Sequence, residues 1–262
     1  MKRTLLAVMP LLLLVACNSG SPIETEQLTN QQTIYLTDAQ TDSLYLYFEI
    51  ENPTRLPSEE ALERVQGSIV TSLFGERYSR LPLAEAMGAY IMMCQQEYME
   101  NNTALAEQMQ DEESEEELDM SLCEEQIMTG RVAYADKNAL SYLIEQYIYM
   151  GGAHGMNTRH AYNYSMETGM LLTESDLFKD NTMEELAELL RNAMVEQNEE
   201  FDSRQELVAA GFDLEKVIPN GNFYFSEDGI TWIFTPYEIA PYVYGETEIF
   251  LDNSRMEEYR KK

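Results

Sequence analysis

Two kinds of hydrophobic periodicity occupy separate stretches of this chain. Between residues 58 and 110 apolar side chains recur at helical spacing, whereas from Glu124 on the period shortens to two, as in strands. Asp136-Lys137-Asn138 and Glu227-Asp228-Gly229 are turn-forming clusters, and each divides two such strands into a predicted β-hairpin. Strands grouped apart from helices predict an α+β fold of two lobes, with antiparallel sheets and helices packed on one side.

Capping residues and apolar positions predict the individual elements. Ser58 precedes the acidic Glu59 and Glu60, which indicates a helix start, and a longer helix is expected from near Pro82 to Gln110. The other expected elements are strands at 34–36, 44–50, 127–135, 140–150, 159–166, 222–225, 230–234 and 246–251, a helix from Thr182 and a short closing helix at 256–262.

The first 17 residues predict export. Two basic residues precede an apolar run at 5–15, which is too short to span a bilayer as a helix. Leu14-Val15-Ala16-Cys17 then resembles a bacterial lipobox, in which the cysteine is acylated and becomes the new N-terminus. We therefore expect residues 1–16 to be a signal peptide and Cys17 to hold the protein on a membrane through lipid. An ordinary cleaved signal with an incidental cysteine is the alternative.

Three segments are expected after the leader. Residues 17–31 carry the lipidated cysteine and a polar, flexible tether. Residues 32–120 are expected to form an N-terminal α+β lobe with an acidic loop, and residues 121–262 a C-terminal α+β lobe. The acidic run at 111–117 contains no glycine, which a calcium loop needs for its turn, so we expect no metal there.

Acidic side chains dominate the charge of the chain. Asp and Glu number 47 against 17 Lys and Arg, for a formal net charge of −30. Such a charge repels nucleic acid and anionic lipid, and it attracts cationic proteins. A hydrophobic fraction of 44% excludes a disordered acidic chain. Nucleic acid is therefore excluded as a partner, and a cationic protein is one class of partner that the charge suits. The alternative, and the more common reading of such a charge, is that it serves only solubility.

The cysteines predict one disulfide. With Cys17 assigned to lipid, Cys94 and Cys123 remain as a pair in a chain that is expected to meet an oxidising compartment. A bond between them would close a loop of roughly 30 residues and contribute about 3 kcal/mol. Two buried thiols are the alternative. Neither cysteine lies in the C-x-x-C context of a redox or zinc motif.

Two short stretches hold the candidate binding residues, which are Gly151, Gly152, His154, Tyr237, Glu238, Tyr242 and Tyr244. The paired glycines allow a sharp turn, or the close approach of a partner to the main chain. Tyrosines in a loop stiffened by prolines are good binding anchors for a sugar or a protein. The alternatives are that His154 only hydrogen-bonds local backbone and that the tyrosines close the end of a sheet core.

Three segments resemble one known family in their order along the chain and in their residues. The segments are Tyr149–Gly155, Thr168–Phe178 and 222–245, in which Gly-Gly-Ala-His and Tyr-Glu-Ile-Ala-Pro-Tyr are the specific pieces. They resemble the RsiV-like envelope domain family. That family includes the extracellular part of a lysozyme-sensing anti-sigma factor and the non-catalytic module of PdaC-type peptidoglycan deacetylases. The resemblance covers about residues 33–257 and implies a two-part α+β fold in the envelope, without one fixed activity.

We therefore expect a lipid-anchored binding protein of the bacterial envelope, on the outer membrane or periplasmic side in a Gram-negative cell, without a cofactor. The resemblance implies a lysozyme-like muramidase or peptidoglycan as its ligand. An envelope hydrolase or metal-assisted enzyme centred on His154 is one alternative, and it requires His154 and His160 to converge with a carboxylate. A structural adaptor lipoprotein is the other.

Overall fold

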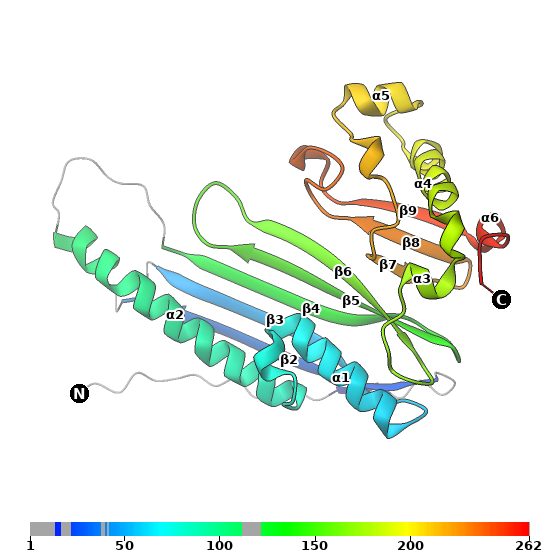
Figure 1. The fold of residues 1–262 in the computed structure, drawn as a ribbon. Coiled ribbons are helices and arrows are strands. Elements are labelled where there is room, and N and C mark those ends of the chain that lie inside the picture. The colour runs from blue at the N-terminus through cyan, green and yellow to red at the C-terminus, as the bar shows by residue number, and fades with distance from the viewer. Residues whose placement is uncertain (1–13, 17–21, 38–39, 41, 112–121, 262) are drawn as a thin grey trace.

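The computed structural model describes residues 14–16, 22–37, 40, 42–111 and 122–261 (Figure 1). Within these residues the strands form two sheets. The large sheet has the order β1 (Leu14–Ala16), β2 (Glu24–Tyr35), β3 (Ser43–Arg55), β4 (Glu124–Ala135), β5 (Ala139–Tyr149) and β6 (Met156–Ser165). The small sheet has the order β7 (Phe223–Phe225), β8 (Gly229–Phe234) and β9 (Thr247–Asp252). The expected α+β class and both expected hairpins are confirmed.

Helices connect and cover the sheets. They are α1 (Glu59–Phe74), α2 (Leu83–Asp111), α3 (Glu174–Leu177), α4 (Met183–Gln197), α5 (Arg204–Ala209) and α6 (Asn253–Met256), with short 3-10 turns at η1 (Glu76–Tyr78), η2 (Asp180–Thr182), η3 (Leu214–Lys216) and η4 (Tyr242–Tyr244). Ser58 caps α1 as expected, because its Oγ accepts a hydrogen bond from Ala61 N at 3.1 Å. The closing helix comprises Asn253–Met256 rather than the expected 256–262, since the Asp252 side chain caps its start. None of the helices in the described residues is long and apolar enough to cross a membrane.

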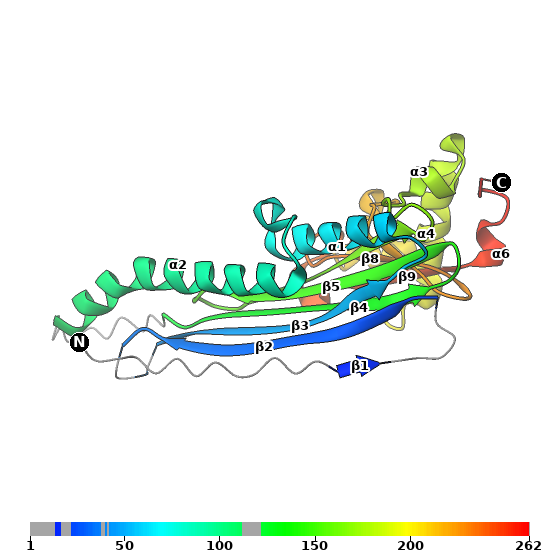
Figure 2. The ribbon, with the colours of Figure 1, turned by 90° about the horizontal axis from the view of Figure 1, so that it is seen from below.

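One strand pairing corrects the expectation of purely antiparallel sheets. β3 and β4 run parallel, with Leu46 opposite Gln126 and Ile50 opposite Gly130. Parallel neighbours need a long crossover connection, and here that connection contains α1 and α2. Both helices lie against one face of the large sheet (Figure 2). The large sheet is therefore mixed.

Two expected boundaries are wrong. Residues 24–31, expected in the tether, belong to β2, which pairs with β3. Leu28, which lies between polar neighbours in the sequence, is buried and anchors this strand in the core. The expected boundary at 120/121 lies in the sequence between β3 and β4, which are neighbouring strands of the large sheet. The core on the helix-covered face of that sheet, which we call the first core, contains residues from Ile23 to Met166. A second core begins at Phe178, so the two lobes divide between Met166 and Phe178. Cys17 and residues 112–117 of the acidic run lie outside the described residues.

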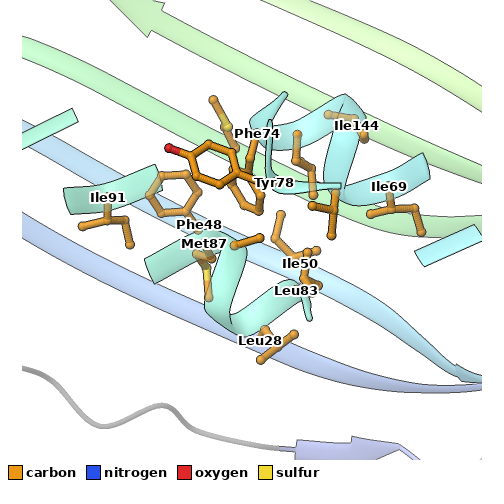
Figure 3. Close-up of a cluster of buried hydrophobic side chains, with 14 of the residues drawn as sticks. Leu28, Phe48, Ile50, Ile69, Phe74, Tyr78, Leu83, Met87, Ile91 and Ile144 are labelled. Atoms are coloured by element: carbon orange, nitrogen blue, oxygen red, sulfur yellow. The ribbon is translucent and has the colours of Figure 1, made fainter. Parts of the chain in front are cut away.

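The alternation of β5 shows how the layers stack. Leu140, Tyr142 and Ile144 face α1 and α2 in the first core, part of which Figure 3 shows. Leu143, one position out of phase, packs against Ile233 of the small sheet. α4 covers the other side of the small sheet, where Leu190 belongs to the second core. Each sheet therefore carries helices on one side, and the two sheets meet at β5 and β6.

Cys94 and Cys123 are not joined by a disulfide in this structure. Cys94 is buried on α2, with its Sγ 3.8 Å from Oε1 of Gln126, and Cys123 is half-buried just before β4. Burial raises the pKa of the Cys94 thiol to about 11. Disulfide formation needs a thiolate, which is therefore scarce at Cys94 near neutral pH. In this structure Cys94 is a buried thiol of the first core, and the disulfide stays a prediction.

We expect alkylation of Cys94 by iodoacetamide at pH 8 to be at least about tenfold slower in the folded protein than in urea, because burial both hides the thiol and raises its pKa. Mass spectrometry of tryptic peptides measures this directly for each cysteine. If Cys94 and Cys123 both resist alkylation in urea until a reductant is added, they form a disulfide and the expectation is contradicted.

Candidate functional site

The fold brings the two glycine- and tyrosine-rich stretches together. One is the turn between β5 and β6, and the other is the connection between β8 and β9 (Figure 1). Tyr242 Oη donates a hydrogen bond to the backbone oxygen of Gly155 at 3.0 Å. The ring of Tyr242 also stacks on that of His154, with centroids 4.6 Å apart and planes 22° apart. The site is therefore made by both sheets.

A third ring extends this stack. Tyr237 stacks on Tyr242 with centroids 5.2 Å apart and planes 28° apart, so that His154, Tyr242 and Tyr237 form a row with Tyr242 in the middle. We call these three side chains the ring row. Tyr237 is 56% exposed and has a φ of +70°, a conformation that a bulky residue rarely adopts. Strain of this kind gathers at functional sites.

Glu238 holds the backbone around Tyr237 in place. Its Oε2 accepts hydrogen bonds from Thr235 N at 2.8 Å and Thr235 Oγ1 at 3.1 Å. Its Oε1 accepts one from Asn220 Nδ2 at 2.8 Å. Three neutral donors therefore occupy this carboxylate, which keeps the loop rigid and presents Tyr237 to solvent. Glu238 therefore supports the site through the loop, and a direct part in binding stays a prediction.

A cavity of about 280 Å³ opens beside the ring row. Its lining includes Glu145, Asn157, Arg159, Pro236, Tyr242 and Glu246. The Arg159 side chain is only 19% exposed and forms ion pairs with Glu246, with Glu248 and, at 3.9 Å, with Glu145. The carboxylates outnumber the guanidinium, so this wall of the cavity is acidic. Arg159 also ties β6 to β9, because its partners lie on both sheets.

The remaining predicted residues have structural roles. Tyr244 packs against Phe201 and Phe212, with centroids 6.0 and 4.8 Å away, and so closes the second core as the alternative foresaw. Gly151 and Gly152 have φ values of +76° and +98°, which glycine adopts without strain, and they form the turn between β5 and β6. Neither Tyr244 nor the glycines belong to the ring row.

The two histidines do not converge. His154 lies against Tyr242, and its Nδ1 is 3.0 Å from the backbone oxygen of Gly155. His160 points to the opposite face of β6 from Arg159 and lines a separate cavity of about 320 Å³. In the part of the chain that the structure describes, no three potential metal-ligating side chains gather. The alternative of a hydrolase or metal site at His154 required convergence, and this geometry does not support it.

Sequence reasoning missed the charged half of the site. Glu145 and Arg159 are register partners on β5 and β6, and Glu246 approaches Arg159 from the other sheet. The register of the predicted hairpin could have paired the first two. Nothing local to the sequence could have placed Glu246 or Glu248 beside them, because the packing of the two sheets does so.

Comparisons with known proteins relate both halves of the site to described families. Residues 175–254 match the family described as a protein of unknown function, DUF3298, and residues 66–157 match the family described as deacetylase PdaC. The peptidoglycan-N-acetylmuramic acid deacetylase PdaC of Bacillus subtilis is 24% identical over 134 residues, which are 50% of this chain and 28% of that protein. The chain thus spans less than a third of this relative's length. The expected similarity to a domain of PdaC-type proteins is confirmed, and the RsiV-like assignment stays a prediction.

Solved structures share the architecture. A DUF3298 family member from Bacteroides fragilis superposes with a TM-score of 0.83 at 22% identity, covering 92% of this chain and 95% of that one. A DUF3298 family protein from Pseudomonas aeruginosa gives 0.63 at 17% identity, with the same coverage. The chain has the DUF3298 fold. The ring row joins the two matched regions, since His154 lies in 66–157 and Tyr237 and Tyr242 lie in 175–254.

Proposed function

We propose that this chain is a lipid-anchored binding protein of the bacterial envelope that captures a cationic muramidase of the lysozyme kind at the ring row. The observation that carries the proposal is the exposed Tyr237 ring, held on a rigid loop beside an acidic cavity wall. Rigid aromatic anchors at the centre of a patch supply most of the binding energy of protein interfaces. The acidic wall complements a cationic partner.

The surroundings of the ring row support a protein ligand. Val243 is 82% exposed on the same loop as Tyr237, and Met150 is 68% exposed at the neighbouring turn. Apolar anchors within a charged rim are the usual anatomy of such interfaces. The net charge of −30 would accelerate the capture of a cationic partner at low ionic strength.

The envelope location rests on two supports. The leader ending in Cys17 is typical of an acylated exported protein. The curated relative bears the name of an enzyme that acts on peptidoglycan, which is an envelope polymer. In this proposal, lipid on Cys17 holds the binding module at the membrane.

A glycan of peptidoglycan is the second candidate ligand, and the cavity favours it. A volume of about 280 Å³ beside stacked rings, with Asn157 and Arg159 in its wall, suits a polar ring compound. The two candidates differ in their salt dependence, because a neutral sugar gains little from the acidic charge of the protein.

Titration calorimetry with hen egg-white lysozyme at two salt concentrations tests the proposal. We expect binding that weakens with salt, and a Tyr237→Ala variant that binds about 10- to 100-fold more weakly, as for an interface hot spot. Tyr237→Phe keeps the ring and is the matched control, with affinity close to that of the unmodified protein. Absence of lysozyme binding, or equal binding by Tyr237→Ala, would contradict the proposal. Binding of soluble muropeptides instead would support the second candidate.

A further inference from the structure

Among the residues that the structure describes, neither helices nor the small sheet cover part of one face of the large sheet. α1 and α2 pack on one face, as Figure 2 shows. On the other face, the small sheet contacts β5 and β6 around Leu143 and Ala161. Farther along, toward the turn between β5 and β6, the side chains on this second face are half-exposed among the described residues.

The strand register gathers aromatic residues on this uncovered area. Tyr47 of β3 is in register with Ile127 of β4, and Ile127 is in register with Tyr147 of β5. Tyr45 and Tyr149 are likewise joined through Glu125. Register partners point to the same side of a sheet. We call Tyr45, Tyr47, Ile127, Tyr147 and Tyr149 the tyrosine face.

The tyrosine face is continuous with the ring row. Tyr147 is the register partner of Asn157, which lines the cavity beside Tyr242. The ring of Tyr147 also lies directly on Gly155, where an added Cβ would come within 2.5 Å of it. Gly155 in turn accepts the hydrogen bond from Tyr242. The two sets of rings therefore meet at Gly155 and form one surface.

Carboxylates lie among these rings. Glu49, Glu125 and Glu145 share this side of the sheet. The basic neighbours of Glu145 are Arg131 at 4.0 Å and Arg159 at 3.9 Å. Tyr47 Oη donates to Glu49 Oε2 at 2.7 Å, which turns the phenol toward an acidic group. Lysine and arginine side chains bind well over tyrosine rings with a carboxylate nearby, through cation–π contact and ion pairing.

We propose that the tyrosine face is the second half of a docking surface for a cationic protein. The bound protein lies across β3, β4 and β5 and also contacts the ring row. The inference rests on the proposed function and extends its site. A stable protein interface buries about 800 Å² on each partner. Two loops alone offer only a small part of such an area, whereas the adjoining strands provide a broad surface of complementary charge.

Matched charge reversals test the tyrosine face. The test variant combines Glu49→Lys with Glu125→Lys. The control combines Glu63→Lys with Glu97→Lys, two exposed positions on α1 and α2 that change the net charge equally on the opposite side of the sheet. Two probes are titrated, hen egg-white lysozyme and a decaarginine peptide, and circular dichroism verifies that both variants are folded.

We expect the test variant to bind each probe at least about tenfold more weakly, while the control changes affinity less than about threefold. Equal losses in the two variants would overturn the docking surface, because only the overall charge would then matter. If the protein binds decaarginine but not lysozyme, the muramidase proposal fails. The affinities of the two variants for decaarginine then still test whether the tyrosine face binds a cationic partner. Binding of neither probe overturns both.

Discussion

Replacing Trp232 by alanine is expected to lower the free energy of unfolding by about 3–5 kcal/mol. Trp232 is fully buried in β8, where its ring packs against Phe178 and Phe223 with centroids 6.3 and 5.8 Å away. Its Nε1 also donates to the buried Glu174 Oε1 at 3.3 Å. The substitution therefore leaves a cavity in the second core and removes one donor from a buried carboxylate.

Urea denaturation followed by far-ultraviolet circular dichroism measures this loss. Trp232 is the single tryptophan of the chain, so tryptophan fluorescence cannot follow the unfolding of variants that replace it. Trp232→Phe is the matched control, and we expect it to lose clearly less stability because most of the ring volume remains. A loss below about 1 kcal/mol for Trp232→Ala would show that the second core does not depend on this ring.

Replacing Asn222 by alanine is expected to lower the free energy of unfolding by about 2–4 kcal/mol, because one buried and one partly buried backbone group lose their hydrogen-bond partners. Asn222 Oδ1 accepts from Ala161 N at 2.8 Å, and its Nδ2 donates to the backbone oxygen of Arg159 at 2.9 Å. The side chain thus supplies hydrogen-bond partners to two backbone groups of the edge strand β6, where the small sheet packs against it. Its loss should also loosen the loop of Tyr237 from the turn of His154, and so weaken binding at the ring row.

Trp232 fluorescence and circular dichroism, compared during urea denaturation, measure the effect of Asn222→Ala. Asn138→Ala is the control, since Asn138 is exposed and its Nδ2 donates to Asp136 Oδ2 at 3.4 Å within the turn between β4 and β5. We expect it to cost under about 1 kcal/mol. Similar losses in the two variants would contradict a special role for Asn222 between the sheets.

Local chemistry made several elements predictable. The turn at 136–138, the Asp228-Gly229 turn and the Ser58 cap each act within a few residues, and all three are present as expected. The α+β class follows from the same local patterns, because helical and strand periods occupy separate stretches. These features need no knowledge of distant contacts.

Features that depend on distant contacts were missed or misplaced. The sequence of β2 is too polar to show the alternation typical of a strand. Its solvent-facing side is polar, and on the side facing the core only Leu28 and Ile34 are apolar. The parallel pairing of β3 with β4 depends on a crossover through two helices. The lobe boundary follows the cores rather than the composition, so it moved from 120/121 to beyond Met166.

The candidate site shows the same division. The sequence by itself determined which two loops hold the glycines and tyrosines, since those residue types have a local conformational meaning. Only the tertiary structure decided that Tyr242 faces His154 while Tyr244 enters a core, and that Arg159 meets carboxylates from both sheets. The physical reason is that the hydrogen bond from Tyr242 to Gly155 joins groups 87 residues apart. Its partners are selected by the packing of two sheets, which no local pattern encodes.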